Sequence, residues 1–489
     1  MKKSSEEFTI FGKQVGYLIV TNVVVVVLTL VQYPILTKAL GPEQYGIWAL
    51  INTTISLISP FALLSFSDAI IQFLAGEKDN HKIRDDYLSA LTVVFFLSTI
   101  FSLILFLCSN LFATYILKDL GATIYIQLSS TLIMLSSTFQ MFLSYFRRGK
   151  NIGTFSVFVL GSNLLSVCLI VAALLLGYNL LGVIISTIIS ASIINLIAVI
   201  VIFKQIKFSR PRFRNIKSYL KWGIPLTPGA AIIWIISTGD RYVVNYFLGP
   251  AAAGIYNAAY GIGFYASFAI YPLGLVLYPY LSNAYSEGDT SKCKVYLEHS
   301  FKYLMMITIA AAVGLSVLAR PLLLRFTTAE FISGTPIVSY TALSGIFFCF
   351  YQFFSYIIYL VGKTRLTIKF LSIAAVLNII LNFIFVPQLG IVGAGLASFI
   401  AYGILGWLTI SASRKMIKFN LNIFFLLKCL IASGVMAVCL WLFKEESLLS
   451  IILSIVVGGL IYFGVLILLR GLKKEEITFF ISFLKRRAK

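Results

Sequence analysis

Long hydrophobic runs alternate with short polar connections along almost the whole chain. A helix needs about 20 apolar residues to cross the hydrocarbon core of a bilayer. A backbone inside lipid must also satisfy its own hydrogen bonds, which favours helices. The pattern therefore predicts fourteen transmembrane helices. They are expected near residues 11–37, 43–75, 87–109, 122–146, 152–176, 180–203, 216–247, 251–283, 297–320, 334–361, 366–386, 390–412, 422–443 and 447–470.

The composition agrees with this pattern. Of the 489 residues, 59% are hydrophobic and 12% are charged, whereas soluble chains carry about 25% charged residues. So little charge cannot cover a globule in water, which predicts an all-α protein that crosses the membrane many times. The first hydrophobic run, from about Val15 to Leu36, is too long for the apolar part of a cleavable signal peptide, and we expect it to remain as the first span.

Basic residues orient the predicted helices. Most of the 39 lysines and arginines fall in the N-terminal segment, in every second connection and in the C-terminal segment. Positive connections stay in the cytoplasm, so both termini are expected to be cytoplasmic and the number of spans even. The same bias, together with attraction to anionic lipids, accounts for the net charge of +21 without a nucleic-acid partner. The opposite connections hold only Lys38, Lys118, Arg241, Arg320, Arg325 and Lys444.

A short phrase occurs twice in the chain, once at Leu40–Trp48 (LGPEQYGIW) and again at Leu248–Tyr256 (LGPAAAGIY). Two membrane-embedded halves of similar plan are typical of transporters that alternate about a central site. Each half is expected to contain six helices, and an even number gives both halves the same orientation. The predicted domains are a six-helix lobe at 1–203, a basic cytoplasmic linker at 204–217, a second six-helix lobe at 218–418, and two extra helices with a basic tail at 419–489.

Each copy of the phrase also carries a glycine four residues after its proline, Gly46 in the first and Gly254 in the second. A Gly-Pro pair suits a tight turn because glycine accepts unusual dihedral angles and proline favours the start of a helix. The shared glycine is then expected one turn into the next helix. A missing side chain at that place permits close helix approach.

Several segments, in this order, carry a resemblance to a known family: the Leu40–Trp48 phrase, the following Leu63–Ala75, Asp240-Arg241 before Leu248-Gly249, and Gly362-Lys363-Thr364. Together they resemble the polysaccharide flippases, the O-antigen and capsule-repeat translocases of the MATE-like MOP superfamily. Members of that family often carry an arginine where this chain has Gln72, so a role for that arginine is not transferred.

The resemblance implies two six-helix lobes in a V-shaped arrangement around a central polar cavity, with two additional C-terminal helices. It also implies that an undecaprenyl-pyrophosphate-linked oligosaccharide is moved from the inner to the outer leaflet of a bacterial cytoplasmic membrane by alternating access. Membrane lipids and other polysaccharide assembly proteins are the further partners that it suggests. No cofactor is expected.

Ionisable residues within spans or at their ends are the candidates for binding a sugar diphosphate. A buried anion loses several kcal/mol of solvation unless cations and hydrogen-bond donors meet it, and an intramembrane charge is a functional hypothesis by default. The alternative for each of them is that its charge only sets the orientation of the helices in the membrane or lies among the lipid headgroups. The candidate substrate-binding residues are Arg241, Asp240, Asp68, Lys38, Arg147, Arg148, Lys363, Arg320 and Arg325.

Other functions stay open at this stage. A cation-coupled drug exporter or a lipid II flippase would use the same fold. A membrane-embedded oligosaccharide polymerase or ligase needs a sizeable outer connection, but the longest one, around Pro321–Gly334, has no histidine. No GxxxxGK[ST] phosphate-binding loop occurs, which disfavours an ATP-driven pump. The six cysteines form no CxxC pair and the two histidines stand alone, so neither a metal site nor a disulfide framework is expected.

Overall fold

The regular structure of the chain is helical in a computed structural model that describes residues 2–77, 79–149, 151–206, 209–443, 447–472 and 476. The elements within these ranges are α-helices joined by short 3-10 and π-helical turns, which confirms the predicted all-α class. The chain divides into two compact units, Met1–Gly254 (unit 1) and Ile255–Lys489 (unit 2).

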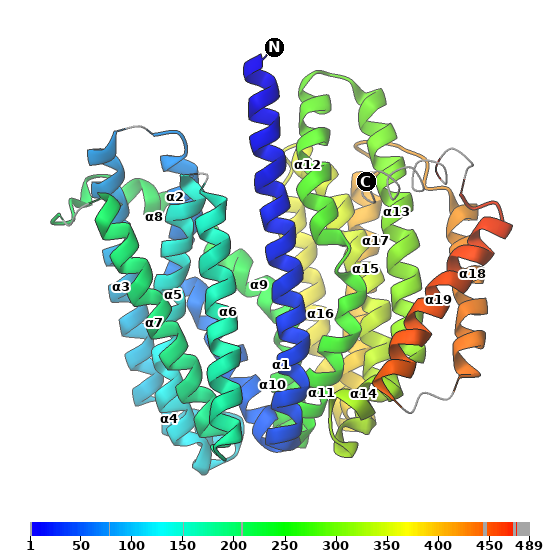
Figure 1. Cartoon of the computed structure of the whole chain (residues 1–489), viewed down its shortest axis with the longest axis horizontal. Coiled ribbons are helices and arrows are strands. Elements are labelled where there is room, and N and C mark those ends of the chain that lie inside the picture. The colour runs from blue at the N-terminus through cyan, green and yellow to red at the C-terminus, as the bar shows by residue number, and fades with distance from the viewer. Residues whose placement is uncertain are drawn as a thin grey trace. The chain divides into compact units, whose positions relative to one another are not determined.

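Unit 1 is a bundle of long helices in which α3, α5, α6 and α7 lie side by side (Figure 1) and α1 packs against α5 and α6. Its helices are α1 (Lys2–Leu63), α2 (Phe66–Leu74), α3 (Asn80–Leu107), α4 (Ser109–Phe112), α5 (Thr123–Arg148), α6 (Ile152–Leu175), α7 (Leu180–Ile206), α8 (Ile216–Gly223), α9 (Thr227–Thr238) and α10 (Asp240–Leu248), with short helical turns η1 (Ala113–Leu117), η2 (Leu120–Ala122) and η3 (Phe213–Asn215).

Helix α1 contains the first predicted span and most of the second, and its helical conformation is interrupted between them at Gly41. The backbone of Gly41 has φ 66° and ψ 177°, a conformation outside the helical region that a residue without a Cβ adopts easily. The second of these spans was predicted to continue to residue 75. It ends at Leu63 instead, because Leu64 and Ser65 take positive φ values before the short helix α2 begins.

The predicted span at 216–247 is broken into three short helices. Helix α8 together with η3 meets α9 at an angle of 44°. Gly239 then separates α9 from α10. By length and apolar composition, 12 described helices qualify as membrane spans, or 13 if the bent pair counts as one span. Since α1 is one of the 12 and covers parts of two predicted spans, the count of fourteen stays a prediction.

Unit 2 is built around α13, α15 and α17, with α16 packed on α17 and α18 packed on both α13 and α19. Its helices are α11 (Pro250–Phe264, whose first turn belongs to unit 1), α12 (Ile270–Ser286), α13 (Thr290–Val317), α14 (Ala319–Phe326), α15 (Thr335–Leu360), α16 (Arg365–Leu389), α17 (Ile391–Ser413), α18 (Ile423–Trp441) and α19 (Leu448–Leu468), with 3-10 turns η4 (Tyr265–Ser267) and η5 (Ala329–Gly334).

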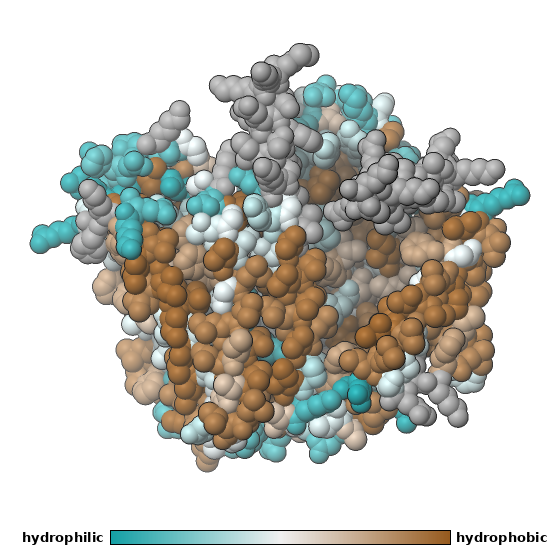
Figure 2. Space-filling view, in the orientation of Figure 1, coloured by the Kyte–Doolittle hydropathy of each residue, from teal (hydrophilic) through white to brown (hydrophobic). Residues whose placement is uncertain are grey.

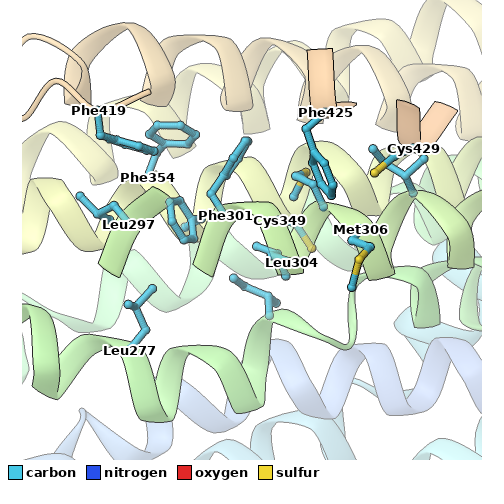
Figure 3. Packing of buried hydrophobic residues seen from close by; sticks show 14 of the residues in the cluster. Leu277, Leu297, Phe301, Leu304, Met306, Cys349, Phe354, Phe419, Phe425 and Cys429 are labelled. Atoms are coloured by element: carbon cyan, nitrogen blue, oxygen red, sulfur yellow. The ribbon is translucent and has the colours of Figure 1, made fainter. Parts of the chain in front are cut away.

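A cluster of buried aromatic and aliphatic side chains holds α13, α15 and α18 together (Figure 3). Phe301 of α13 lies at its centre, with ring centroids 5.7 Å from Phe354 and 6.4 Å from Phe419. Phe425 and Cys429 bring α18 into the same cluster. The first of the two extra C-terminal helices is therefore an integral part of unit 2.

The flanks of the long helices are covered with hydrophobic side chains, and hydrophilic ones gather at the helix ends (Figure 2). Many of these flanking side chains are large and exposed, such as Phe96 and Leu107 of α3 and Leu460 of α19. An exposed apolar surface of this extent would cause aggregation in water but is the surface that lipid requires. The protein is a multi-pass membrane protein.

The second half of the predicted linker is docked on unit 1. The Asn215 amide donates to both carboxylate oxygens of Asp86 on α3, at 2.9 and 3.2 Å, and the Tyr219 hydroxyl donates to one of them at 3.5 Å. Helix α9 packs on α1. The boundary between the compact units consequently falls after Gly254 rather than at the linker, and the predicted division into lobes stays a prediction.

The two copies of the repeated phrase touch each other within unit 1. A Cβ placed on Gly46 would overlap the carbonyl oxygen of Pro250, and a Cβ placed on Gly254 would overlap the carbonyl oxygen of Pro42. The contact is reciprocal, since each glycine receives the backbone of the other copy. The close helix approach predicted from these glycines is confirmed.

Replacement of Gly46 by alanine should destabilise the protein by about 1–3 kcal/mol, the usual cost of overpacking, because backbone atoms cannot move aside as a flexible side chain can. Thermal unfolding of the purified protein in detergent measures this. Gly153→Ala is the matched control, since Gly153 lies in a helix and has no atom within 4 Å of an added Cβ. Equal melting temperatures for the two variants would contradict the reciprocal contact.

Candidate functional site

Polar residues form a stripe on one face of α1 and another on one face of α5. Asn52, Ser56 and Ser59 follow one another at helical spacings of four and three residues on α1. Ser136, Gln140, Ser144 and Arg147 do the same on α5, since residues three or four apart lie on one face of a helix. The two stripes line one pocket within unit 1.

This pocket, called here the Asp68–Arg147 pocket, has a volume of about 530 Å³. Such a volume lies within the usual range for small-ligand sites, about 300–1,000 Å³. Its lining residues are Asn52, Ile55, Ser56, Ser59, Pro60, Leu63, Ser67, Asp68, Ser136, Gln140, Leu143, Ser144 and Arg147.

Asp68 lines the pocket because the opposite, apolar face of α2 is the one that is buried. Phe66, Ala69, Ile70 and Leu74 form the buried face of α2, at the spacing of an amphipathic helix. Asp68 lies off that face and is exposed. The left-handed backbone at Leu64 and Ser65 is the turn that separates this short helix from α1.

Arg147 supplies the positive charge of the pocket. It lies in the last turn of α5, while Asp68 lies in the first turn of α2. Each charge thus stabilises the helix end on which it lies through the helix dipole. Among the residues that the structure describes, no ion pair within 4 Å involves either side chain. Both charges face the pocket with hydrogen-bonding capacity available for a ligand.

The uncharged groups of the pocket are partly committed to the fold. The hydroxyls of Ser59 and Ser136 lie 3.3 Å apart and connect α1 with α5. The Asn52 amide donates to the carbonyl oxygen of Trp48 at 2.9 Å, which leaves the side-chain oxygen of this exposed residue as an acceptor. Gln140 is also exposed to the pocket.

A second pocket of about 250 Å³ adjoins the first one and shares Asn52, Ile55 and Ser136 with it. Its other wall comes from α6 and α7 and includes Ser162, Ser166, Thr187, Ser190 and Asn195. The Asn195 side chain is held in place, since its amide donates to the Ala191 carbonyl at 2.7 Å and its oxygen accepts from Thr138 at 3.0 Å. The lining of this second pocket is free of charged residues.

Helix α9 is fastened to the polar stripe of α1 by one tryptophan. The indole N–H of Trp234 donates to the Thr53 carbonyl oxygen and to the Ser56 hydroxyl, both at 3.0 Å. The neighbouring hydroxyls of Tyr242 and Thr54 lie 2.5 Å apart. One wall of the Asp68–Arg147 pocket is therefore linked to the broken seventh span.

Asp240 and Arg241, two of the sequence-predicted candidates, form a buried ion pair. One guanidinium nitrogen of Arg241 lies 3.1 Å from a carboxylate oxygen of Asp240, and it also donates to the Ser237 carbonyl oxygen at 2.9 Å. The Arg241 side chain is 8% exposed and the Asp240 side chain is 0% exposed. Neighbouring helix positions point about 100° apart, so spacing alone did not predict this pair. In this structure the Arg241 charge is already neutralised by its neighbour.

The other candidates lie outside the two pockets. Lys38 is exposed on α1 shortly before the Gly41 kink, and Arg148 lies over the ring of Tyr145, 5.1 Å from its centroid. Lys363 is exposed between α15 and α16 in unit 2. Arg320 and Arg325 are both exposed on α14. The structure brings together Asp68 with Arg147 and Asp240 with Arg241.

Several pocket residues were not predicted from the sequence. Asn52, Gln140 and the serines that line the pocket were not among the candidate residues. A search for polar residues recurring at intervals of three and four within a span would have found both stripes. Among the described residues, no group of three or more His, Cys, Asp or Glu side chains is arranged to hold a metal ion.

The fold of the chain matches that of known membrane proteins. The fold is that of the MATE-like MOP superfamily: the chain aligns with the solved structure titled "Lipid II flippase MurJ, inward closed conformation" with a TM-score of 0.72 and 19% identity, over 92% of this chain and 98% of that one. A family model described as MatE matches residues 225–384. A model described as polysaccharide biosynthesis protein matches residues 11–285, more than half of the chain. The chain belongs to the polysaccharide biosynthesis protein family, which confirms the resemblance stated from the sequence.

Two curated relatives match about half of the chain. The uncharacterized membrane protein MJ1068 of Methanocaldococcus jannaschii is 26% identical over 273 residues, which are 55% of this chain and 53% of the relative. The probable low-salt glycan biosynthesis flippase Agl15 of Haloferax volcanii is 21% identical over 272 residues, 54% of this chain and 57% of the relative. The matched region thus spans about half the length of each of these relatives.

The buried pair Asp240–Arg241 generates a prediction about stability. Asp240→Asn leaves the Arg241 charge buried without its carboxylate partner, which typically costs about 3–5 kcal/mol. The double variant Asp240→Asn/Arg241→Gln removes both charges and should recover most of that loss. Thermal unfolding in detergent compares the two. A single variant as stable as the wild type would show that the pair is not needed for the fold.

Proposed function

We propose that this protein is a flippase that moves an undecaprenyl-pyrophosphate-linked oligosaccharide from the inner to the outer leaflet of a bacterial cytoplasmic membrane. Both termini lie in the cytoplasm, and the two halves alternate in opening toward each side. The lipid tail stays in the bilayer while the polar headgroup crosses within the protein. The protein acts as a transporter and not as an enzyme.

The observation that carries this proposal is the Asp68–Arg147 pocket. It combines one basic side chain, Arg147, and one acidic side chain, Asp68, with many neutral hydrogen-bonding groups inside a helical bundle that has an apolar exterior. A diphosphate-linked sugar presents the complementary pattern, namely a compact anion beside a ring of hydroxyls. Membership of the polysaccharide biosynthesis protein family and the name of the Haloferax volcanii relative support the same substrate class.

Each kind of group in the pocket has a distinct proposed role. The planar guanidinium of Arg147 donates two parallel hydrogen bonds to phosphate oxygens, a geometry that lysine does not offer. The side chains of Asn52 and Gln140 bond sugar hydroxyls. The Asp68 carboxylate accepts hydrogen bonds from hydroxyl groups of the sugar, at a place set apart from the phosphate charge. Together these groups replace the water that the headgroup loses.

One observation favours a second candidate function. Asp68 is an acidic group exposed to a pocket, as an exporter of cationic drugs requires, and the MatE model matches part of the chain. Arg147 lines the same pocket and opposes a cationic substrate there, so the anionic headgroup is the better fit. A lipid II flippase shares the diphosphate and differs in the sugar.

A direct test uses the full chain reconstituted in vesicles that contain a fluorescent undecaprenyl-diphosphate oligosaccharide. The fraction of label reached by a membrane-impermeant quencher should change with time under an imposed ion gradient, relative to protein-free vesicles. Lipid II and a cationic dye serve as competing cargoes in parallel vesicles. Movement of the dye without movement of the glycan lipid would replace the proposal by the exporter function.

The role of Arg147 predicts that Arg147→Gln lowers the initial translocation rate about tenfold or more, because a hydrogen bond to a charged group contributes about 1.5–3 kcal/mol. Arg214→Gln is the matched control. Arg214 is an exposed base of the same unit that lies outside the pocket, and this variant should transport like the wild type. Wild-type transport by Arg147→Gln at normal membrane abundance would remove Arg147 from the site.

A further inference from the structure

Unit 2 contains a separate pocket where the ends of α13, α14 and α18 meet. Its volume is about 370 Å³, within the range of small-ligand sites. The basic residues near the start of α13 (Lys292, Lys294) and before α18 (Arg414, Lys415) lie at the opposite ends of these helices. The pocket is lined by Val317, Arg320, Pro321, Leu324, Leu440, Trp441 and Phe443.

Arg320 is the charged group of this pocket. The end of α13 and the start of α14 join at Leu318, and Arg320 is exposed in the first turn of α14. Within the described part of the chain, no carboxylate lies within 4 Å of its guanidinium group. Arg320 is also one of the few bases on the side that is predicted to be outer, so the positive-inside bias does not explain its presence.

The remaining lining suits the boundary between lipid headgroups and acyl chains. Trp441 is 79% exposed and Phe443 is 52% exposed at the end of α18, and tryptophan is enriched at membrane interfaces. Val317, Leu324 and Leu440 provide an apolar surface beside the guanidinium group. Hydrophilic atoms over α14 lie next to the hydrophobic face of α19 (Figure 2).

We propose that this pocket binds the phosphate headgroup of an anionic phospholipid of the outer leaflet. Arg320 donates bidentate hydrogen bonds to the phosphate oxygens. Trp441 and Phe443 lie at the level of the glycerol backbone, and the aliphatic side chains contact the first carbons of an acyl chain. The bound lipid bridges α14 and α18, and it therefore ties a helix outside the repeated halves to the second half.

A phospholipid fits this site better than a free phosphate ion does. Besides Arg320 and Pro321, the lining consists of three aliphatic and two aromatic side chains, and a small hydrated ion leaves those apolar groups without contacts. The proposal does not depend on the identity of the transported substrate, because the pocket lies in unit 2 and shares no residue with the Asp68–Arg147 pocket.

Native mass spectrometry of the delipidated full chain, titrated with phosphatidylglycerol or with phosphatidylcholine, tests the proposal. The wild type should bind one phosphatidylglycerol more tightly than phosphatidylcholine. Arg320→Gln should weaken phosphatidylglycerol binding about tenfold or more, as expected for the loss of a charge-assisted hydrogen bond. The matched control is Arg325→Gln, which removes the same charge from an exposed position on the same short helix outside the pocket and should bind like the wild type.

Three results would overturn the proposal. Unchanged binding by Arg320→Gln would remove Arg320 from the site, and equal losses in the two variants would indicate general attraction to positive charge. Displacement of the bound lipid by millimolar inorganic phosphate would indicate a site for free anions.

A crosslinking measurement on the wild-type protein covers the case in which Arg320→Gln fails to fold. Phosphatidylglycerol with a photoactivatable group near its headgroup should label peptides from the α13–α14 junction and from the end of α18. Labelling confined to other helices would exclude this pocket as the lipid site.

Discussion

A polar group carried into the bilayer is stabilised by a partner within the protein, because lipid offers none. Most hydroxyls within spans satisfy this requirement locally. Thr53 and Thr409, for example, each donate to the carbonyl oxygen four residues earlier, at 2.7 Å. Asp240 and Arg241 satisfy it by pairing with each other. The same constraint separates polar groups that serve the fold from those that stay open toward a pocket, and Asp68 and Arg147 belong to the second kind.

The hydrophobic pattern was sufficient to predict an all-helical membrane protein and most of its long helices, since apolar runs of this length have one stable form in lipid. It was less informative where helices break. The seventh span was predicted as one helix, although Pro225 and Pro228 lie at its bend. The break between α1 and α2 requires positive φ values at two non-glycine residues, Leu64 and Ser65, which no sequence pattern indicates.

The candidate site was predictable only in part, for a related reason. Asp68 was a candidate because charges are rare in spans, and Arg147 was a candidate as a base at the end of a predicted span. That they line one pocket depends on the break before α2 and on the packing of α1 and α2 against α5. The serines and Gln140 carry little information individually, because most serines in these helices bond to their own backbone. Only their alignment along two facing helices shows that they share a pocket.

The fold is shared with proteins named as lipid II flippases and as multidrug transporters, so the architecture alone does not define a cargo. The distinguishing information lies in the chemistry of the pocket. In the proposed function, Arg147 and the neutral donors and acceptors of this pocket bind the anionic sugar headgroup. The Asp68 carboxylate is proposed to accept hydrogen bonds from the sugar hydroxyl groups.

The reciprocal contact of Gly46 and Gly254 has a consequence for biogenesis. Chains emerge from the ribosome in order, and N-terminal regions generally fold first. Unit 1, however, extends to Gly254, and its docking partners for α1 include Trp234 of α9 and the Pro250 backbone. The long helices α1, α3, α5, α6 and α7 are therefore inserted before two of the contact partners of α1, Trp234 and Pro250, have been synthesised. The reciprocal contact of Gly46 can form only after the chain has been translated as far as Gly254.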